Sequence, residues 1–461
     1  MLISLAPLLL ALPTPGDLLL EDTRLATLPE GVALEGEPIT DPNGDPYQVV
    51  HRVVWSPDGR RVAYVGIKGE ATHPVIGDEV LDDYHYISAP EFSADGEHVL
   101  FRVGNRKTKS RELWALLYDG EEVGGEDWIG EPRLSPDGLA IAYWIQPGAR
   151  VTSSGPYNRG AQIFCLSERK GSKWKTSKSP KYDDASSLNR PVFSADGKVV
   201  ATSCMDGSEW SILRFTRGKK KPKAEGQFFS PWVDLALSPD GKRWAATVHT
   251  FEDLMAGGNP RSPGGGANYR IQFDGKTVGR HYDAAGGPVF SPKGDKLAYK
   301  VKRGNRYGIG YDDRDDVEPS YDFVYRPVFE PKGKGIAYVA ASGVSPEPYW
   351  SVTSMGEYNL KGGTRFVVRE SLSRRKPAQG TEWLEIKDLV FSPDGEHLAY
   401  AARDAEGWQV VLDEVAGPRH DEVGAPRFSE DSATLVHGAR DGAEIWWRVW
   451  AADSEPAPDS E

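Results

Sequence analysis

The sequence predicts an all-β protein, built as a single β-propeller of four-stranded antiparallel blades, most simply nine of them, with eight as the alternative. Three observations lead to this prediction. One short turn motif recurs nine times along the 461 residues, apolar runs flank each copy, and glycine and proline are abundant, with 50 and 34 residues. A motif that recurs at intervals of 37 to 62 residues indicates a propeller or a solenoid, because each unit is one supersecondary element.

The motif is Ser-Pro-Asp-Gly or a close variant, preceded by apolar residues. Its first positions are Ser56, Ser93, Ser135, Ser194, Ser238, Ser291, Glu330, Ser392 and Ser429. The departures are Lys293 and Lys332 in place of Asp, Glu330 in place of Ser, and Ser432 in place of Gly. They weaken the turn without abolishing it.

The chemistry of the motif is that of a type I turn between two strands. Serine suits the first position, proline sets φ at the second, and glycine accepts the left-handed conformation that ends the turn. Alternating runs such as Arg61–Val65 and Leu297–Val301 flank it, so each copy predicts a β-hairpin. A second hairpin follows, with strands such as Tyr269–Phe273, which gives four strands per unit.

An aspartate precedes most copies of the motif. It stands eight residues before the first position at Asp127, Asp283, Asp322 and Asp421, and Asp83 and Asp183 occupy similar places after small insertions. We interpret it as a turn or cap residue where each outer strand crosses to the next blade. A ring of catalytic carboxylates is the alternative interpretation.

The full pattern, an apolar residue, Pro, Phe-Ser-Pro-Asp-Gly and then Ala-Tyr, resembles the WD40-like (PD40) repeat of TolB-type β-propellers. The resemblance covers roughly residues 47–450. TolB carries a separate α/β domain ahead of its propeller, and no segment here is suited to form one. The resemblance therefore implies the propeller fold and not the specific partners of TolB.

The two ends of the chain are expected to join in one blade. The last copy has two strands followed by Glu444–Trp450 and then an acidic tail, so the last blade lacks its outer strand. The segment Leu25–Leu34 is available to provide it. We divide the chain into an apolar start of signal-peptide length (1–16), an N-terminal segment that donates the closing strand (17–46), the propeller (47–450) and an acidic, Pro-containing tail (451–461).

Composition and the apolar start bear on location. The start predicts export to a periplasmic or extracellular location, with a cytoplasmic location as the alternative, although no clean cleavage site precedes Gly16. No stretch reaches the length of a transmembrane helix.

The net charge of −13 counts against nucleic acid as a specific partner. Cys165 and Cys204 could form a disulfide only if the fold brings them together.

No motif carries recognisable catalytic chemistry. Gly-x-Ser-x-Gly, His-Glu-x-x-His and Cys-x-x-Cys are all absent. We therefore assign no catalytic residue, no metal ligand and no cofactor.

Two lysine-rich stretches stand out against the acidic composition. By their position in the repeat, the stretches 169–181 and 217–223 should form third turns of adjacent blades. In a four-stranded blade the first and third turns share one face, so the two stretches should lie side by side on that face. The predicted partner-binding residues are Arg169, Lys170, Lys173, Trp174, Lys175, Lys178, Lys181, Arg217, Lys219, Lys220, Lys221 and Lys223. Solvated loops that prevent aggregation are the alternative interpretation.

The sequence thus favours a non-catalytic scaffold, monomeric, that binds a protein or an anionic envelope polymer through this basic face. The alternative is an enzyme of lyase or lactonase type with its active site at the channel mouth. Propellers host both classes, so fold alone does not separate them.

Overall fold

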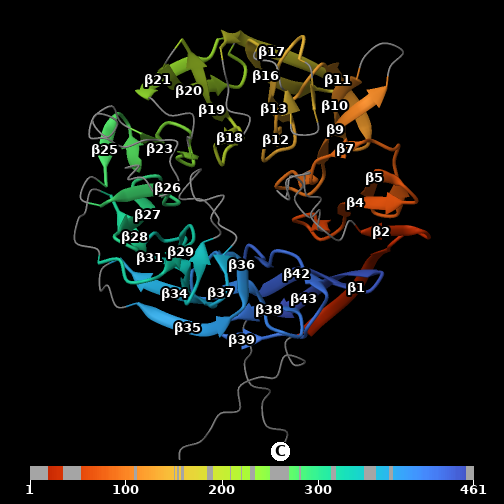
Figure 1. Ribbon diagram of the computed structural model, residues 1–461. Helices are drawn as coiled ribbons and strands as arrows, with labels where there is room; N and C mark the ends of the chain where they lie inside the picture. Colours follow the sequence, from red (N-terminus) through yellow and green to blue (C-terminus); the bar gives the residue numbers. More distant parts are fainter. Residues whose placement is uncertain are drawn as a thin grey trace, which may run out of the picture.

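Nine antiparallel sheets stand side by side around a central opening in the computed structural model (Figure 1). The structure describes residues 19–34, 53–107, 112–149, 151–152, 155–156, 160–183, 190–207, 209–219, 221–228, 234–249, 269–279, 282–312, 318–346, 360–372 and 377–452. Across these ranges the regular elements are strands, and none contains a helix long and apolar enough to cross a membrane. The nine-bladed, all-β prediction is confirmed over the eight-bladed alternative.

The first four blades follow the chain from the N-terminal side. Blade 1 contains β2 (Val32–Leu34), β3 (Val54–Trp55), β4 (Val62–Lys68), β5 (Ala71–Ile76) and β6 (Glu79–Val80). Blade 2 contains β7 (Tyr86–Ile87), β8 (Glu91–Phe92), β9 (Val99–Lys107), β10 (Glu112–Tyr118) and β11 (Glu121–Glu126). Blade 3 contains β12 (Arg133–Leu134), β13 (Ala140–Ile145), β16 (Gln162–Lys170) and β17 (Lys173–Tyr182). Blade 4 contains β18 (Val192–Phe193), β19 (Val199–Asp206), β20 (Glu209–Thr216) and β21 (Lys223–Phe228).

Four further blades complete most of the ring. Blade 5 contains β22 (Asp234–Leu237), β23 (Trp244–His249), β24 (Tyr269–Phe273) and β25 (Lys276–Val278). Blade 6 contains β26 (Ala284–Phe290), β27 (Leu297–Arg303) and β28 (Arg306–Tyr311) among the described residues. Blade 7 contains β29 (Phe323–Val324), β30 (Val328–Phe329), β31 (Gly335–Ser342), β34 (Thr364–Ser371) and β35 (Ala378–Trp383). Blade 8 contains β36 (Glu385–Phe391), β37 (Leu398–Arg403), β38 (Trp408–Leu412) and β39 (Val415–Ala416).

Two short hairpins stand apart from the blades, one inserted between β13 and β16 and the other between β31 and β34. They are β14 (Val151–Thr152) with β15 (Gly155–Pro156) in blade 3, and β32 (Ser345–Pro346) with β33 (Leu360–Lys361) in blade 7.

Blade 9 closes the ring by combining both ends of the chain. It contains β40 (Glu422–Val423), β41 (Arg427–Phe428), β42 (Thr434–Asp441), β43 (Glu444–Ala451) and, as its outer strand, β1 (Leu19–Thr27). In Figure 1 the red β1 lies beside the blue β43. The closing strand was predicted within Leu25–Leu34, but the strand that pairs with β43 begins earlier, at Leu19, and only its last residues fall within that range. The end of the predicted segment, Val32–Leu34, pairs with β4 of blade 1 instead.

The repeated motif forms the same hydrogen-bonded turn in every blade. In blade 3, the Gly138 N–H donates to the Ser135 carbonyl over 2.9 Å, and the Ser135 hydroxyl donates to Asp137 over 2.6 Å. The same hydroxyl accepts the Ala140 N–H. The serine is fully buried, because its hydroxyl both donates and accepts within the turn. Ser432, which replaces glycine in the last copy, adopts the left-handed conformation at φ 64°.

The turns of successive blades contact one another around the ring. The Ala94 N–H in blade 2 donates to the Pro136 carbonyl in blade 3, and the Asp196 N–H in blade 4 donates likewise to Pro239 in blade 5. Farther round, Lys296 in blade 6 donates to the Gly333 carbonyl in blade 7. We call the side of the ring that carries the first and third turns of the blades the turn face.

The aspartate that precedes the motif caps the second turn of its own blade, on the opposite side of the ring. Its carboxylate accepts the N–H of the turn glycine at distances of 2.6 to 2.8 Å; the pairs are Asp127 with Gly148, Asp183 with Gly207, Asp283 with Gly304, Asp322 with Gly343, and Asp421 with Gly442. The prediction of a turn or cap residue is confirmed for these five.

The core consists of apolar clusters packed between neighbouring blades. The largest combines blades 2, 3 and 4 and includes Leu116, Trp144, Phe164 and Phe215. Cys165 and Cys204 are both buried in this cluster as free thiols, and burial raises the pKa of each to about 12. They therefore act as small apolar residues in the core.

Candidate basic site on the turn face

The two lysine-rich stretches flank third turns of adjacent blades. The turn of blade 3 joins β16 to β17 between Lys170 and Lys173, and that of blade 4 joins β20 to β21. Lys178 and Lys181 instead lie along β17, and Lys181 is opposite Ile163 at the far end of the strand pair. The Gly218 N–H, in the third turn of blade 4, lies 3.4 Å from the Glu168 carboxylate of β16 in blade 3. This contact places the two third turns side by side. The two turns are adjacent, as predicted, but the prediction that all of 169–181 forms a turn is wrong, because its second half continues the outer strand β17. Whether the lysines bind a partner stays a prediction.

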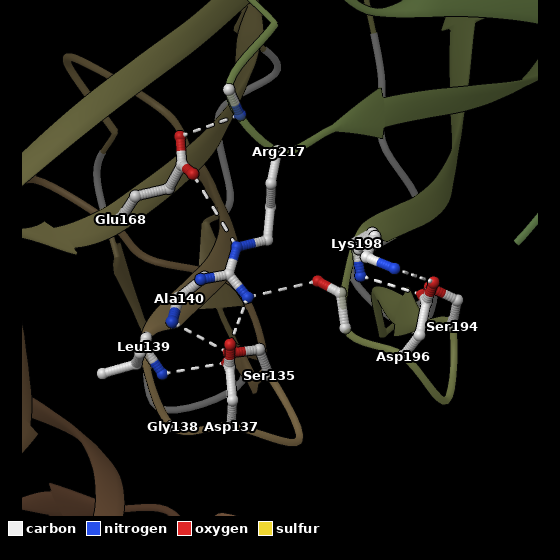
Figure 2. Close-up of polar contacts among 12 residues, drawn as sticks. Ser135, Asp137, Gly138, Leu139, Ala140, Glu168, Ser194, Asp196, Lys198 and Arg217 are labelled. Atoms are coloured by element: carbon white, nitrogen blue, oxygen red, sulfur yellow. Dashed lines mark hydrogen bonds and ion pairs between the residues drawn. The ribbon is translucent and has the colours of Figure 1, made fainter. Parts of the chain in front are cut away.

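Arg217 joins blades 3 and 4 (Figure 2). Its guanidinium forms an ion pair with Asp137 over 2.6 Å, and its Nε lies 3.7 Å from Glu168. The same group donates to the Gly197 carbonyl in the first turn of its own blade. Arg217 therefore neutralises two acids of blade 3 and is itself only partly exposed.

The electrostatics of Asp137 follow from these contacts. Burial opposes ionisation of the carboxyl, but the hydrogen bonds from Ser135 and Arg217 outweigh that effect. They hold the pKa of Asp137 below its usual value, so the ion pair with Arg217 persists over the physiological pH range.

Two of the predicted site residues pack against blade 2 instead of facing solvent. Trp174 contacts the Tyr118 ring edge to face, at 4.9 Å between centroids. Arg169 lies over the same ring and donates to the Tyr118 hydroxyl over 3.2 Å. Burial raises the pKa of Tyr118 to about 12, so the phenol stays neutral. Trp174 and Arg169 thus stabilise the interface between blades.

Two of the predicted lysines pair with acids. Lys178 lies 3.4 Å from Glu126 of blade 2, and Lys223 lies 3.0 Å from Glu225 of its own strand. Glu225 also accepts the Trp244 indole N–H of blade 5, so its charge is shared among several donors.

The remaining described lysines are exposed and form no ion pair with another described residue; they are Lys170, Lys173, Lys175, Lys181, Lys219 and Lys221. Lys220 lies outside the described residues. We call these six the free lysines. Lys175 is the register partner of Glu168 on β16, so it belongs to the side of blade 3 that faces Arg217 and the blade 4 turn.

The sequence does not identify the acids that shape this site. Asp137 belongs to the repeated turn and Glu168 stands within a strand, so neither is distinguishable from its counterparts in other blades by sequence. Their significance depends on Arg217 reaching across from the next blade, a contact between residues 80 apart in the chain.

Charged groups also gather near the central opening, on the inner strands of blades 2 and 3. Arg133 forms an ion pair with Glu91 over 3.2 Å, and burial raises the pKa of Glu91 despite that partner. Arg102 pairs with Glu131 and lies over the rings of Tyr86 and Trp114. Within the described part of the chain, no group of three or more His, Cys, Asp or Glu side chains is arranged to hold a metal ion.

Comparison with known proteins finds solved structures of low sequence identity. No family model matches the chain, and no curated protein matches it. Among solved structures, the Dos1 propeller is 10% identical over 92% of this chain and 96% of its own length, with a TM-score of 0.44. An oligogalacturonate lyase in complex with manganese is 12% identical over 87% and 96%, with a TM-score of 0.37.

TolB from Acinetobacter baumannii is a further structural neighbour. It is 15% identical over 88% of this chain and 80% of its own length, with a TM-score of 0.29.

Proposed function

We propose that this chain is a non-catalytic β-propeller scaffold that binds an acidic protein or an anionic envelope polymer through the third turns of blades 3 and 4. One observation carries the proposal. Asp137 and Glu168, the acids beside the two turns, are already paired with Arg217, and the free lysines form no ion pair with another described residue.

The charge distribution gives this arrangement its physical meaning. The chain as a whole carries −13, so a local excess of lysine on two adjacent turns creates a field opposite in sign to the rest of the surface. Such a patch accelerates encounter with an anionic partner and selects its orientation more than it adds affinity. We further propose that the protein is a monomer that acts outside the cytoplasm, in line with its apolar start.

The proposal is tested by crosslinking capture from the envelope and soluble fractions of the native host. The bait is the intact protein, compared with the double variant Lys173→Glu, Lys219→Glu. We expect a captured partner to be lost or weakened at least about tenfold with the variant, since like charges then replace attractive ones.

A matched control makes the same change in charge on the opposite face. Lys68 and Arg306 stand on second turns, and Lys68→Glu with Arg306→Glu should leave capture unchanged. Arg306 loses only an exposed ion pair with Asp322, which costs little stability. Equal capture by all three baits would contradict the proposal.

A further inference from the structure

A leucine stands exposed on the turn face, in the first turn of blade 3. Leu139 follows the turn glycine and is 40% exposed. In the other copies of the motif the residue at this position is charged or small; these residues are Arg60, Glu97, Lys198, Lys242, Asp295, Lys334, Glu396 and Ala433. A single exposed leucine is common on protein surfaces, so the role of Leu139 depends on what surrounds it.

The backbone of Leu139 is held by the ion pair that shapes the basic site. Its N–H donates to the Asp137 carboxylate over 3.1 Å, and Asp137 pairs with Arg217 of blade 4 (Figure 2). Its carbonyl accepts the Arg169 N–H over 2.8 Å. Leu139 is therefore presented by a rigid turn, and the protein loses little conformational entropy when a partner covers it.

Leu139 lies on the side of blade 3 that faces blade 2. Arg169 is its hydrogen-bonded neighbour on β16, and the register partner of Arg169 on β17 is Trp174. Residues opposite one another on antiparallel strands project from the same side of a sheet. Arg169 and Trp174 both reach Tyr118 of blade 2, so Leu139 extends this row of packed side chains to the surface of the turn face.

Blades 3 and 4 place uncompensated positive charge on one side of Leu139. The free lysines beside the two third turns are Lys170, Lys173, Lys175, Lys219 and Lys221. The exposed acids in the first turns of the same blades are neutralised within the protein. Asp137 pairs with Arg217 over 2.6 Å, and Asp196 lies 3.2 Å from Lys198.

Blade 2 places negative charge on the other side of Leu139. Glu97 in its first turn and Glu121 after its third turn are exposed and form no ion pair with another described residue. A polymer of uniform negative charge that covered Leu139 would approach these carboxylates and be repelled. A protein segment can instead present acids to one side of an apolar residue and none to the other.

We propose that the partner bound at blades 3 and 4 is a protein segment with one large apolar side chain that covers Leu139, and with acidic residues that lie toward blade 4. This inference rests on the proposed function and specifies its partner as a protein. An apolar contact at the centre with charged groups around it is the usual arrangement of a protein–protein interface.

Selection of random linear peptides on the full-length protein, at physiological salt, tests this partner. We expect the selected peptides to share one large apolar residue with Asp and Glu gathered to one side of it. Selection on the variant Leu139→Ser should keep the acids and lose the preference for an apolar residue. The turn should tolerate this change, because its hydrogen bonds at this position use the backbone of Leu139.

The affinity of the selected peptide, measured by fluorescence anisotropy, gives the size of the effect. Leu139→Ser should weaken binding at least about fivefold. Replacing the apolar residue of the peptide by serine should weaken it by a similar factor, and the two changes together should cost little more than either alone. The matched control is Leu384→Ser, which should leave binding unchanged. Leu384 is 41% exposed and occupies, in blade 8, the position of the capping aspartate on the opposite side of the ring.

The outcomes separate this inference from the proposed function. If the selected peptides are acidic without an apolar preference, or if Leu139→Ser binds them as tightly as the natural sequence, the apolar contact is excluded and the basic site still stands. Additive losses in the combined change would also exclude a direct contact with Leu139. If no acidic peptide is selected, the protein partner is excluded, and capture from the host alone decides the proposed function.

Discussion

Replacing Gly438 by valine should destabilise the protein by about 1–3 kcal/mol, because the new side chain would overpack the interface between blades 1 and 9 and displace Trp55. A Cβ atom on Gly438 would lie 2.1 Å from the indole of Trp55, closer than any real contact. Trp55 is buried there and donates its indole N–H to the Trp446 carbonyl over 3.1 Å. Urea denaturation of the variant measures the loss.

A second strand glycine provides the control. A Cβ on Gly125 would meet nothing closer than 3.9 Å, so Gly125→Val should cost much less. The cause is checked by combining Gly438→Val with Trp55→Val, since the extra cost should largely disappear once the indole is gone. Equal midpoints for the two valine variants, or additive effects in the double variant, would show that this contact does not close the ring.

Acidification should destabilise the same closing blade through His437. This side chain is fully buried, and burial lowers its pKa to about 3. The unfolded chain takes up a proton at this position below a pKa of about 6.5, whereas the folded chain does not until about 3. Stability present at neutral pH is therefore lost as pH falls through this window, by about 2–3 kcal/mol near pH 4.5.

The surroundings of His437 oppose its charging. Burial is the main cause of the lowered pKa, and the nearby His420 and Arg448 add to it. The bond from Nδ1 to the Gly438 carbonyl over 2.9 Å acts in the opposite direction but does not outweigh them. The ring packs edge to face on Trp450. The free energy of unfolding from urea denaturation should fall between pH 7.5 and pH 4.5 in both proteins. The fall should be smaller for His437→Leu than for the natural sequence, by about 2–3 kcal/mol. The control is His85→Leu, at an exposed histidine, which should keep the pH dependence of the natural sequence. If His437→Leu also keeps that pH dependence, His437 is excluded as its cause.

The fold could be predicted from sequence because its signal is local and repeated. Each motif encodes one turn through Ser, Pro and Gly, and nine copies specify nine blades independently of how the blades pack. Even the weakest copy keeps its turn, with Ser432 in the glycine conformation. The position of the closing strand is predicted imprecisely, because β1 carries no motif and its register is set by pairing with β43 at the far end of the chain.

The candidate site could be predicted only in outline. Turn order determines which loops share a face, so the order of strands along the chain is enough to bring the lysines of blades 3 and 4 together. The partners of individual side chains could not be predicted, because they come from neighbouring blades. Trp174 is expected from sequence to contact a ligand but packs on Tyr118, and Arg217 is expected to be a free cation but pairs with Asp137.

Binding through the turn face requires that the partner cover the free lysines beside the two turns. Lysine acylation of the intact protein, in buffer and in host extract, measures this residue by residue by mass spectrometry. We expect Lys173, Lys175, Lys219 and Lys221 to be at least about tenfold less reactive in extract, while Lys68 on the opposite face stays reactive. Unchanged reactivity of the four, or protection of Lys68 in their place, would contradict binding through the turn face.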